Sequence, residues 1–137
     1  MSVVVPHRAI SLVAESKNPK RTIIDTIGDL SGVDVLFNMV LIGTYIRPNV
    51  TKGGIIRPDA NVQEDVWQGK AGLVLKIGPN AFVDDTDDSF YGQRVEVGEW
   101  CVYKVGDAWS LNINNYPCRL VRDSSIKLKV KDPNIVF

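Results

Sequence analysis

The sequence predicts a mostly β protein built as one domain. From Val33 onward, short apolar segments alternate with glycine and proline, a pattern typical of barrels and sandwiches rather than of parallel sheets with crossover helices. The chain has 137 residues, of which 45% are hydrophobic and 23% charged, so it is long enough to bury a core without disulfides or metals. We therefore predict an all-β barrel or sandwich preceded by an extended N-terminal arm.

The first candidate element is the β-branched run Val3, Val4 and Val5. β-Branched residues favour extended structure, and Pro6 ends the run because proline cannot donate to a central sheet ladder. The run predicts a single short edge strand. No basic region followed by a long apolar segment occurs here, and no stretch approaches the roughly 20 apolar residues of a membrane helix. We expect neither export nor a membrane anchor.

The second element is a helix that begins near Asn18. Asn18 followed by Pro19 is typical of an N-cap and a first helical position, and Ser31 with Gly32 is expected to end the helix. Four apolar residues fall on one face at helical spacing: Ile23, Ile24, Ile27 and Leu30. This face needs a surface to cover it. We therefore expect these four residues, together with Val3 to Val5, to contact a neighbouring subunit or a larger assembly.

Four further segments are predicted to be strands. Residues 33–46 are expected to form one long or bent strand, and residues 72–78 a half-buried strand that alternates leucine and isoleucine with Val74 and Lys76. Residues 100–106 form a third candidate. The last, residues 126–131, alternates apolar residues with lysines and places a row of charge on the open face: Lys127, Lys129 and Lys131.

The sequence contains no pattern that indicates catalysis. Its single histidine, His7, lies far in sequence from any partner that would make it a catalytic base. Neither the glycine-rich phosphate loops nor the nucleophile and zinc motifs of common enzyme classes occur. Cys101 and Cys118 lack metal-ligand spacing and are expected to be buried, which suits a reducing cytoplasm. We predict a protein that is not an enzyme and holds no cofactor or metal.

Four aspartates leave a calcium-binding module open as a further alternative. They are Asp84, Asp85, Asp87 and Asp88. Converging carboxylates attract calcium, but their spacing does not fit an EF-hand loop, so a solvated loop is the favoured interpretation.

Charge gives no indication of a nucleic-acid partner. Sixteen basic residues balance sixteen acidic ones, so no basic groove is expected in which tryptophans would stack on bases. The three tryptophans are Trp67, Trp100 and Trp109. We expect them to anchor the core or a subunit interface instead.

Four segments, in order, resemble the GroES-type co-chaperonin family. They are TKGGIIRPD at 51–59, GLVLKIGP at 72–79, VGEWCVY at 97–103 and YPCRLVRDSSIKLKV at 116–130. The first is similar to the mobile loop of the family, and the others to its glycine-bounded strand, its valine-glycine turn and its closing strands. The resemblance implies an irregular β-barrel that assembles into rings. It divides the chain into an N-terminal arm at 1–37, a barrel at 38–131 and a C-terminal tail at 132–137.

The resemblance also implies a partner-binding loop formed by Gly53, Gly54, Ile55, Ile56 and Arg57. In the family this loop grips an apolar groove on the chaperonin ring. The two glycines free the backbone to take many conformations, and the two isoleucines are apolar enough to enter such a groove. A hairpin connection whose isoleucines fold back onto the barrel is the structural alternative.

Two departures from the family pattern decide which functional hypothesis is placed first. Arg57 stands where the family usually continues with a third apolar residue, and a guanidinium is costly to leave in an apolar groove. The N-terminal arm is also longer than in the family. The first hypothesis is therefore a divergent, phage-like member that decorates a bacteriophage capsid in the virion, after assembly in the host cytoplasm. The alternative is a cytoplasmic co-chaperonin that caps a chaperonin ring, and both hypotheses predict a homo-oligomer without nucleic-acid or membrane partners.

Overall fold

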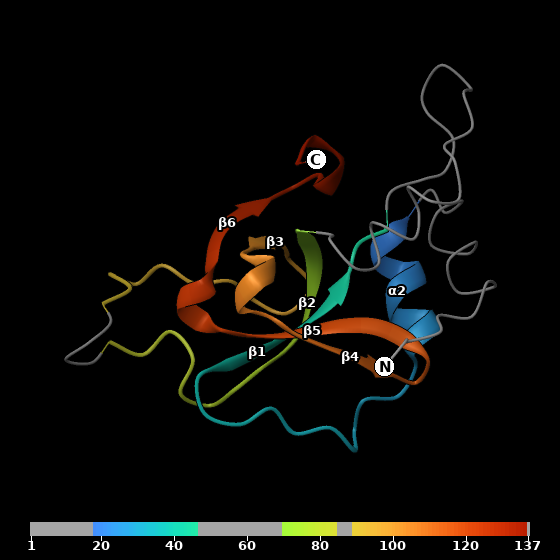
Figure 1. Cartoon of the computed structure of the whole chain (residues 1–137), viewed down its shortest axis with the longest axis horizontal. Coiled ribbons are helices and arrows are strands. Elements are labelled where there is room, and N and C mark those ends of the chain that lie inside the picture. Colours follow the sequence, from blue (N-terminus) through green and yellow to red (C-terminus); the bar gives the residue numbers. More distant parts are fainter. Residues whose placement is uncertain (1–17, 47–69, 85–88, 137) are drawn as a thin grey trace.

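In a computed structural model, the described part of the chain forms one antiparallel sheet of six strands and one α-helix (Figure 1). The structure describes residues 18–46, 70–84 and 89–136. The helix is α2 (Pro19–Ile27), and the strands are β1 (Met39–Thr44), β2 (Ala71–Ile77), β3 (Trp100–Tyr103), β4 (Trp109–Ile113), β5 (Tyr116–Arg122) and β6 (Ile126–Val130). Short 3-10 turns follow at η1 (Val105–Asp107), η2 (Asp123–Ser125) and η3 (Pro133–Ile135). The prediction of a mostly β fold is confirmed.

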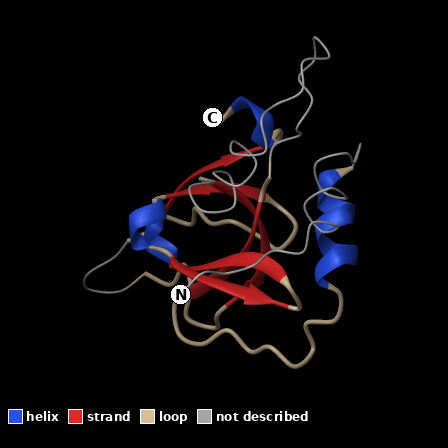
Figure 2. Cartoon of the chain, turned by 45° about the vertical axis from the view of Figure 1, so that its right-hand side comes forward, coloured by secondary structure: helices blue, strands red, loops and turns tan. Residues whose placement is uncertain are grey.

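The strand order β4-β5-β1-β2-β3-β6 places β1 and β2 at the centre of the sheet and β4 and β6 at its two edges. Every neighbouring pair runs antiparallel. The sheet curls around a common centre, and α2 lies beside it (Figure 2). This arrangement agrees with the irregular β-barrel that the family resemblance implies.

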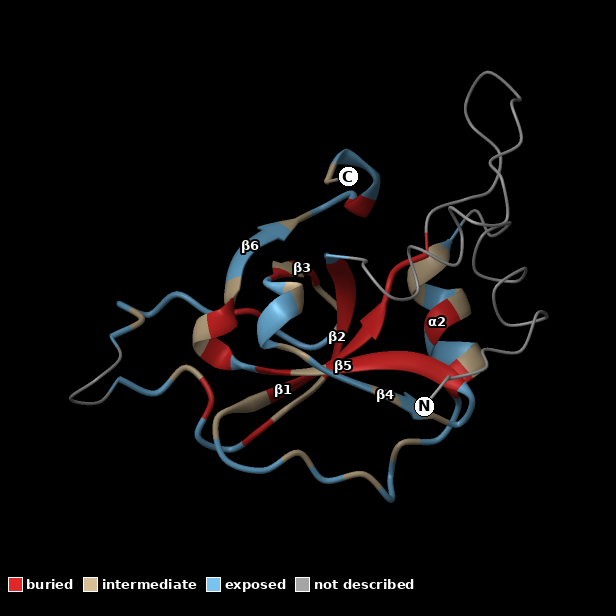
Figure 3. Cartoon of the chain, in the orientation of Figure 1, coloured by how far each residue is buried: buried red, intermediate tan, exposed pale blue. Residues whose placement is uncertain are grey.

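The two central strands are buried on both faces, as the red ribbon of β1 and β2 shows (Figure 3). Leu41 and Leu73 belong to one hydrophobic cluster, which also receives α2. Val40 and Val74 belong to a second cluster on the other face. The prediction of a half-buried strand at 72–78 is therefore wrong at Val74, which is fully buried. Successive residues of β2 face two different hydrophobic clusters, whereas in a half-buried strand they would face one cluster and solvent.

The strand predicted at 33–46 is shorter than expected, because β1 begins only at Met39. Phe37 takes the left-handed conformation, with φ 55, and this turns the chain before the strand starts. Two backbone hydrogen bonds hold the turn. Asn80 N–H donates to the Phe37 carbonyl at 3.0 Å, and Gly78 N–H donates to the Met39 carbonyl at 2.8 Å. Residues 33–38 thus lie as a loop along the end of β2.

Helix α2 begins as predicted and ends earlier. The Asn18 carboxamide oxygen accepts a hydrogen bond from Arg21 N–H at 3.3 Å, and Pro19 occupies the first turn. The predicted end at Ser31 and Gly32 is wrong, because Gly28 takes φ 73 and its N–H bonds to the Ile24 carbonyl at 3.0 Å. A left-handed glycine directly after the last turn stops the helix there.

The hairpin of β4 and β5 includes a strand that the sequence did not predict. Asn114 and Asn115 form its two-residue turn, both with positive φ, between the paired residues Ile113 and Tyr116. The Asn114 side-chain amide also donates to the Ile27 carbonyl at 2.7 Å. This bond ties the tip of the hairpin to the C-terminal end of α2.

Strand β6 forms the edge with the predicted lysines. Lys127 and Lys129 are exposed, as expected, and Leu128 between them is also exposed. The turn η2 that leads into β6 is fixed by Asp123, whose buried carboxylate accepts hydrogen bonds from Phe82 N–H at 3.0 Å and Ser124 N–H at 2.7 Å. The Asp123 carboxylate therefore caps two loops from a buried position.

Candidate partner-binding site

Strands β1 and β2 lead into and out of residues 47–69, the segment that contains the predicted partner-binding loop. Two backbone hydrogen bonds close the base of this segment. Tyr45 N–H donates to the Ala71 carbonyl at 3.0 Å, and Tyr103 N–H donates to the Lys70 carbonyl at 3.0 Å. We call residues 44–46 and 70–72 the stem. Both of its sides are pinned to neighbouring strands, so the segment starts and ends at fixed points.

Gly72 allows β2 to lie close against β1 next to the stem. A Cβ at this position would lie 2.3 Å from Ile42 Cγ2 and 2.6 Å from the Gly43 carbonyl oxygen. Both distances are far inside van der Waals contact, and one of them is to backbone. Only glycine fits here without a shift of the sheet.

Tyr45 holds the stem to the rest of the molecule. Its ring is buried and meets the Trp100 ring edge to face, with centroids 5.2 Å apart and an interplanar angle of 69°. Its hydroxyl donates a hydrogen bond to the Asn134 side-chain oxygen at 2.5 Å. The C-terminal turn η3 is thereby attached to the base of the segment.

Tyr116 supports the stem from β5. Its hydroxyl donates to the Thr44 carbonyl at 2.7 Å, at the last residue of β1. Burial raises the pKa of the Tyr116 phenol well above its ordinary value, so the group stays a neutral donor at every physiological pH. The hydrogen bond from Tyr116 to the stem is therefore buried and neutral, and a change in pH within this range does not break it.

The predicted loop residues and the first arm residues lie outside the described residues. These are Gly53, Gly54, Ile55, Ile56 and Arg57 of the loop, and Val3, Val4 and Val5 of the arm. His7, Trp67, Asp85, Asp87 and Asp88 lie outside them as well. Their roles stay predictions.

The other predicted arm residues are placed by the structure. Ile23 and Ile27 are buried and belong to the same cluster as β1 and β2, so this chain's own core covers them. Leu30 follows the helix and packs against that cluster. Ile24 alone among the four stays exposed, at 47%. Most of the predicted apolar face is thus used within the subunit.

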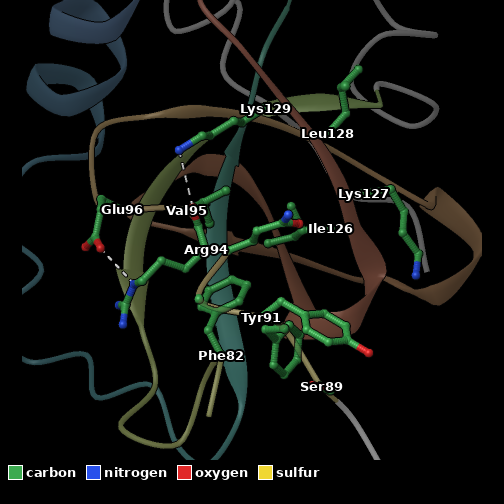
Figure 4. Close-up of a pocket in the computed structure, with 13 residues that line it drawn as sticks. Phe82, Ser89, Tyr91, Arg94, Val95, Glu96, Ile126, Lys127, Leu128 and Lys129 are labelled. Carbon is green, nitrogen blue, oxygen red and sulfur yellow. Dashed lines mark hydrogen bonds and ion pairs between the residues drawn. The ribbon is translucent and has the colours of Figure 1, made fainter. Parts of the chain in front are cut away.

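A groove that the sequence did not predict lies between residues 89–96 and β6 (Figure 4). It has a volume of about 530 Å³. Its charged side chains are partly paired, since Arg94 Nε lies 2.7 Å from a Glu96 carboxylate oxygen and the Arg94 guanidinium lies 5.7 Å from the centre of the Phe82 ring. Tyr91 stands exposed beside them. The groove offers aromatic and aliphatic surface with charged side chains around it.

Asp84, Cys101 and Cys118 are the described candidates for metal or thiol chemistry, and their settings do not favour it. Within the described ranges, no group of three or more histidine, cysteine or acidic side chains is arranged to hold a metal ion. Asp84 is exposed, and its carboxylate accepts a hydrogen bond from Phe90 N–H. Cys101 and Cys118 are buried, as predicted, and burial raises the pKa of each thiol to about 12. Neither thiol forms the reactive thiolate near neutral pH.

The tryptophans fall into different environments. Trp100 is buried in the core, as predicted for an anchor. Trp109 is 72% exposed at the start of the edge strand β4. Among the described helices, none has the length and apolar character to cross a membrane.

The curled antiparallel sheet of six strands defines a protein of the irregular β-barrel class (Figure 2). The chaperonin 10 kDa subunit family matches residues 33–130, which is most of the chain, and the protein belongs to this family. The match confirms the family resemblance that the four sequence segments carry. A search of curated proteins found no match.

Proposed function

We propose that the protein is a co-chaperonin, which binds a chaperonin ring as a homo-oligomer. The observation that carries the proposal is the family match over residues 33–130, together with a stem that holds both ends of the matched loop segment. The family is non-enzymatic, so the function requires no catalytic step. The match reverses the order of the two hypotheses from the sequence, because it supports the ring-capping hypothesis and gives no support to a capsid partner.

In this proposal Gly53 and Gly54 supply the flexibility of the loop, and Ile55 and Ile56 enter an apolar groove of the partner. Fixing a loop residue costs of order 1–2 kcal/mol, so a docking loop gains affinity when the rest of its anchor is already ordered. The stem meets this condition. Its tyrosines and strand hydrogen bonds are formed by described residues of the chain itself.

The test is to mix the protein with a chaperonin and nucleotide and to measure complex formation for the wild type and for Ile55→Asp. A carboxylate in an apolar groove is expected to weaken binding by about 100-fold or more. Val83→Asp is the matched control, because Val83 is 56% exposed and lies with Phe37 and Asn38 before the start of β1, at the opposite end of that strand from the stem. Its replacement is expected to leave binding intact. Equal binding by the two variants, or none by the wild type, would overturn the proposal.

Arg57 provides a second test of the same docking mode. If it lies at the rim of the groove in place of the usual third apolar residue, Arg57→Leu should bind the chaperonin more tightly, by about threefold to tenfold. Weaker binding by Arg57→Leu would show that the guanidinium has a charged partner on the ring.

The N-terminal arm remains a candidate second contact between subunits, through Val3 to Val5 and the exposed Ile24. Because Ile23 and Ile27 complete the core, the deletion that tests the arm has to stop before α2. We propose removing residues 1–17 and measuring the assembly mass. A smaller assembly with an unchanged far-ultraviolet circular dichroism spectrum is expected, and an unchanged mass would remove the arm from the interface.

A further inference from the structure

The C-terminal turn η3 contacts the stem from outside the residues that the family model matches. The match ends at residue 130, and η3 lies just beyond it. The Tyr45 hydroxyl of the stem nevertheless donates a hydrogen bond to the Asn134 side-chain oxygen, 89 positions away in the sequence. An element added to the matched barrel is therefore in direct contact with the base of residues 47–69.

The backbone of η3 holds Asn134 in place. Pro133 is buried, and its ring restricts the backbone at the first position of the turn. The Asp132 carboxylate accepts a hydrogen bond from Asn134 N–H at 2.9 Å, and Val136 N–H donates to the Pro133 carbonyl at 3.3 Å. Because the turn is ordered by these contacts, little freedom is lost when the Asn134 side chain bonds to Tyr45.

A ring contact gives Tyr45 a second connection to the end of β6. The last residue of β6 is Val130, which pairs with Trp100 of β3, and the Trp100 ring packs edge to face on the Tyr45 ring. Tyr45 is therefore joined to the C-terminal part of the chain through Trp100 and through Asn134. Two contacts on one side chain restrict it more than either alone, because the first lowers the entropy cost of forming the second.

Tyr45 passes this restraint to the backbone of the stem. Its N–H donates to the Ala71 carbonyl at 3.0 Å, which joins the two sides of the stem. Since the Tyr45 side chain is buried and bonded to Asn134, its backbone cannot move far from Ala71 without breaking the contact with η3 as well. Closure of the stem and the position of η3 are thus coupled.

We propose that Asn134 is a positioning residue for the partner-binding loop, and that η3 keeps the stem closed for docking. The inference rests on the proposed co-chaperonin function, because it concerns the same loop. When the stem is open, its residues have to be ordered together with the loop on binding, which adds to the entropy cost. Only the fraction of molecules with a closed stem is then ready to dock, and the apparent affinity falls by that fraction.

Hydrogen exchange tests the contact between η3 and the stem without any partner. Asn134→Leu removes the oxygen that accepts from the Tyr45 hydroxyl, so exchange of the Tyr45 amide should become about threefold to tenfold faster. Exchange of the Asp123 amide, which donates to the Asn38 carbonyl at the opposite end of β1, should stay unchanged. Equal acceleration at both amides would indicate a general loss of stability and would overturn the assignment.

Chaperonin binding in the presence of nucleotide tests the functional consequence. Asn134→Leu is expected to bind about threefold to tenfold more weakly than the wild type. Asn134→Asp keeps an oxygen that accepts the hydrogen bond, and it should bind within about twofold of the wild type. Asn80→Leu is the matched control, because Asn80 is also an exposed asparagine but follows β2 at the end away from the stem. Its binding should equal that of the wild type.

A double-mutant cycle shows whether Asn134 acts through Tyr45. Tyr45→Phe removes the same hydrogen bond from the other side, so adding Asn134→Leu to it should weaken binding no further. Additive effects of the two changes would overturn the inference, as would equal or tighter binding by Asn134→Leu alone. Failure of the wild type to bind a chaperonin would instead refute the proposed function and the docking role with it, whereas the exchange measurement would still decide whether η3 holds the stem.

Discussion

The centre and the edges of this sheet follow opposite rules of composition. In β1 and β2, residues 40–44 and 71–75 are buried, and their two faces contribute to separate hydrophobic clusters. In β4 and β6, no residue is fully buried, and every strand position is half-buried or exposed. Packing therefore decides which residues the central strands tolerate, whereas solvent and partners decide this for the edges.

The centre and the edges of the sheet therefore have different roles, in stability and in association. The central strands end in the stem, residues 44–46 and 70–72, from which residues 47–69 start and to which they return. Neutral hydrogen bonds from Tyr116 and from the backbone hold the stem in place. The edges differ from each other in charge, since β6 presents lysines and β4 has none. Stability should then be sensitive to small changes at the centre, and association should be sensitive to changes at the edges.

The largest effect is expected at Gly72. Gly72→Ala places a methyl group 2.3 Å from Ile42 Cγ2 and 2.6 Å from the backbone of β1, so the central strands have to separate. Overpacking of this kind costs about 3 kcal/mol of unfolding free energy. Urea denaturation measures it. Gly106→Ala is the matched control, because nothing lies within 4 Å of the new methyl group, and its cost should stay below about 0.5 kcal/mol.

A smaller effect is expected when Tyr116 loses its hydroxyl. Tyr116→Phe leaves the Thr44 carbonyl without its buried donor and should lower the free energy of unfolding by about 1–2 kcal/mol. The same change at Tyr91, which is 84% exposed, should alter stability by less than about 0.5 kcal/mol. Similar costs at the two tyrosines would contradict the distinction between centre and periphery.

Glu99, which pairs with Lys129 of β6, should make the stability of the fold depend on pH. A hydrogen bond from Glu96 N–H lowers the pKa of the Glu99 carboxyl from its ordinary value of 4.5, and Lys129, 3.4 Å away, lowers it further. A depressed pKa in the folded state stabilises the fold above the unfolded-state pKa, and this contribution is lost as pH falls through the folded-state pKa.

Glu99→Gln should therefore be slightly less stable than the wild type above about pH 5, by no more than about 0.5 kcal/mol because the pair is solvent-exposed. The difference should shrink toward zero as the pH falls below 4.5. Thermal melts across this range measure it, with Glu96→Gln as the control for the loss of one carboxylate on the same turn. A difference that grows on acidification would contradict the assignment.

The smallest effect on stability is expected at Lys127, where the change should appear in association. Lys127→Val makes β6 resemble β4 by removing an exposed edge charge, and the free energy of unfolding should change by less than about 0.5 kcal/mol. Light scattering at rising protein concentration should show increased association. Lys104→Val, an exposed lysine outside the strands, is the control and should not show it.

Much of the sheet could be predicted from sequence, because its signals are local. Alternation of lysine with apolar residues identified β6, and Asn18 with Pro19 identified the start of α2. The errors occurred where one residue takes a left-handed conformation. Phe37 shortens β1 and Gly28 ends the helix early. The unpredicted strand β4 is short and half polar, and its best signal was the Asn114–Asn115 pair, since asparagine tolerates the conformation of a tight hairpin turn.

The candidate site was less predictable than the fold. The stem depends on side chains that meet only through the sheet, such as Tyr45 with Asn134, 89 residues apart. The groove beside β6 likewise joins Arg94 and Phe82 to residues 126–129. Apolar spacing also could not show that Ile23 and Ile27 would be covered by the same chain, because periodicity identifies a face and not its partner.

The pairing of β1 with β5 has a consequence for how the chain acquires its structure. Met39 is opposite Arg122, so the central ladder joins residues 83 positions apart. During synthesis, β1 has to wait until nearly the whole sequence has emerged before its second neighbour exists. Topologies dominated by such distant pairings fold slowly and leave apolar strands unprotected meanwhile. A truncation anywhere before β5 should therefore yield an aggregating fragment and not a smaller barrel.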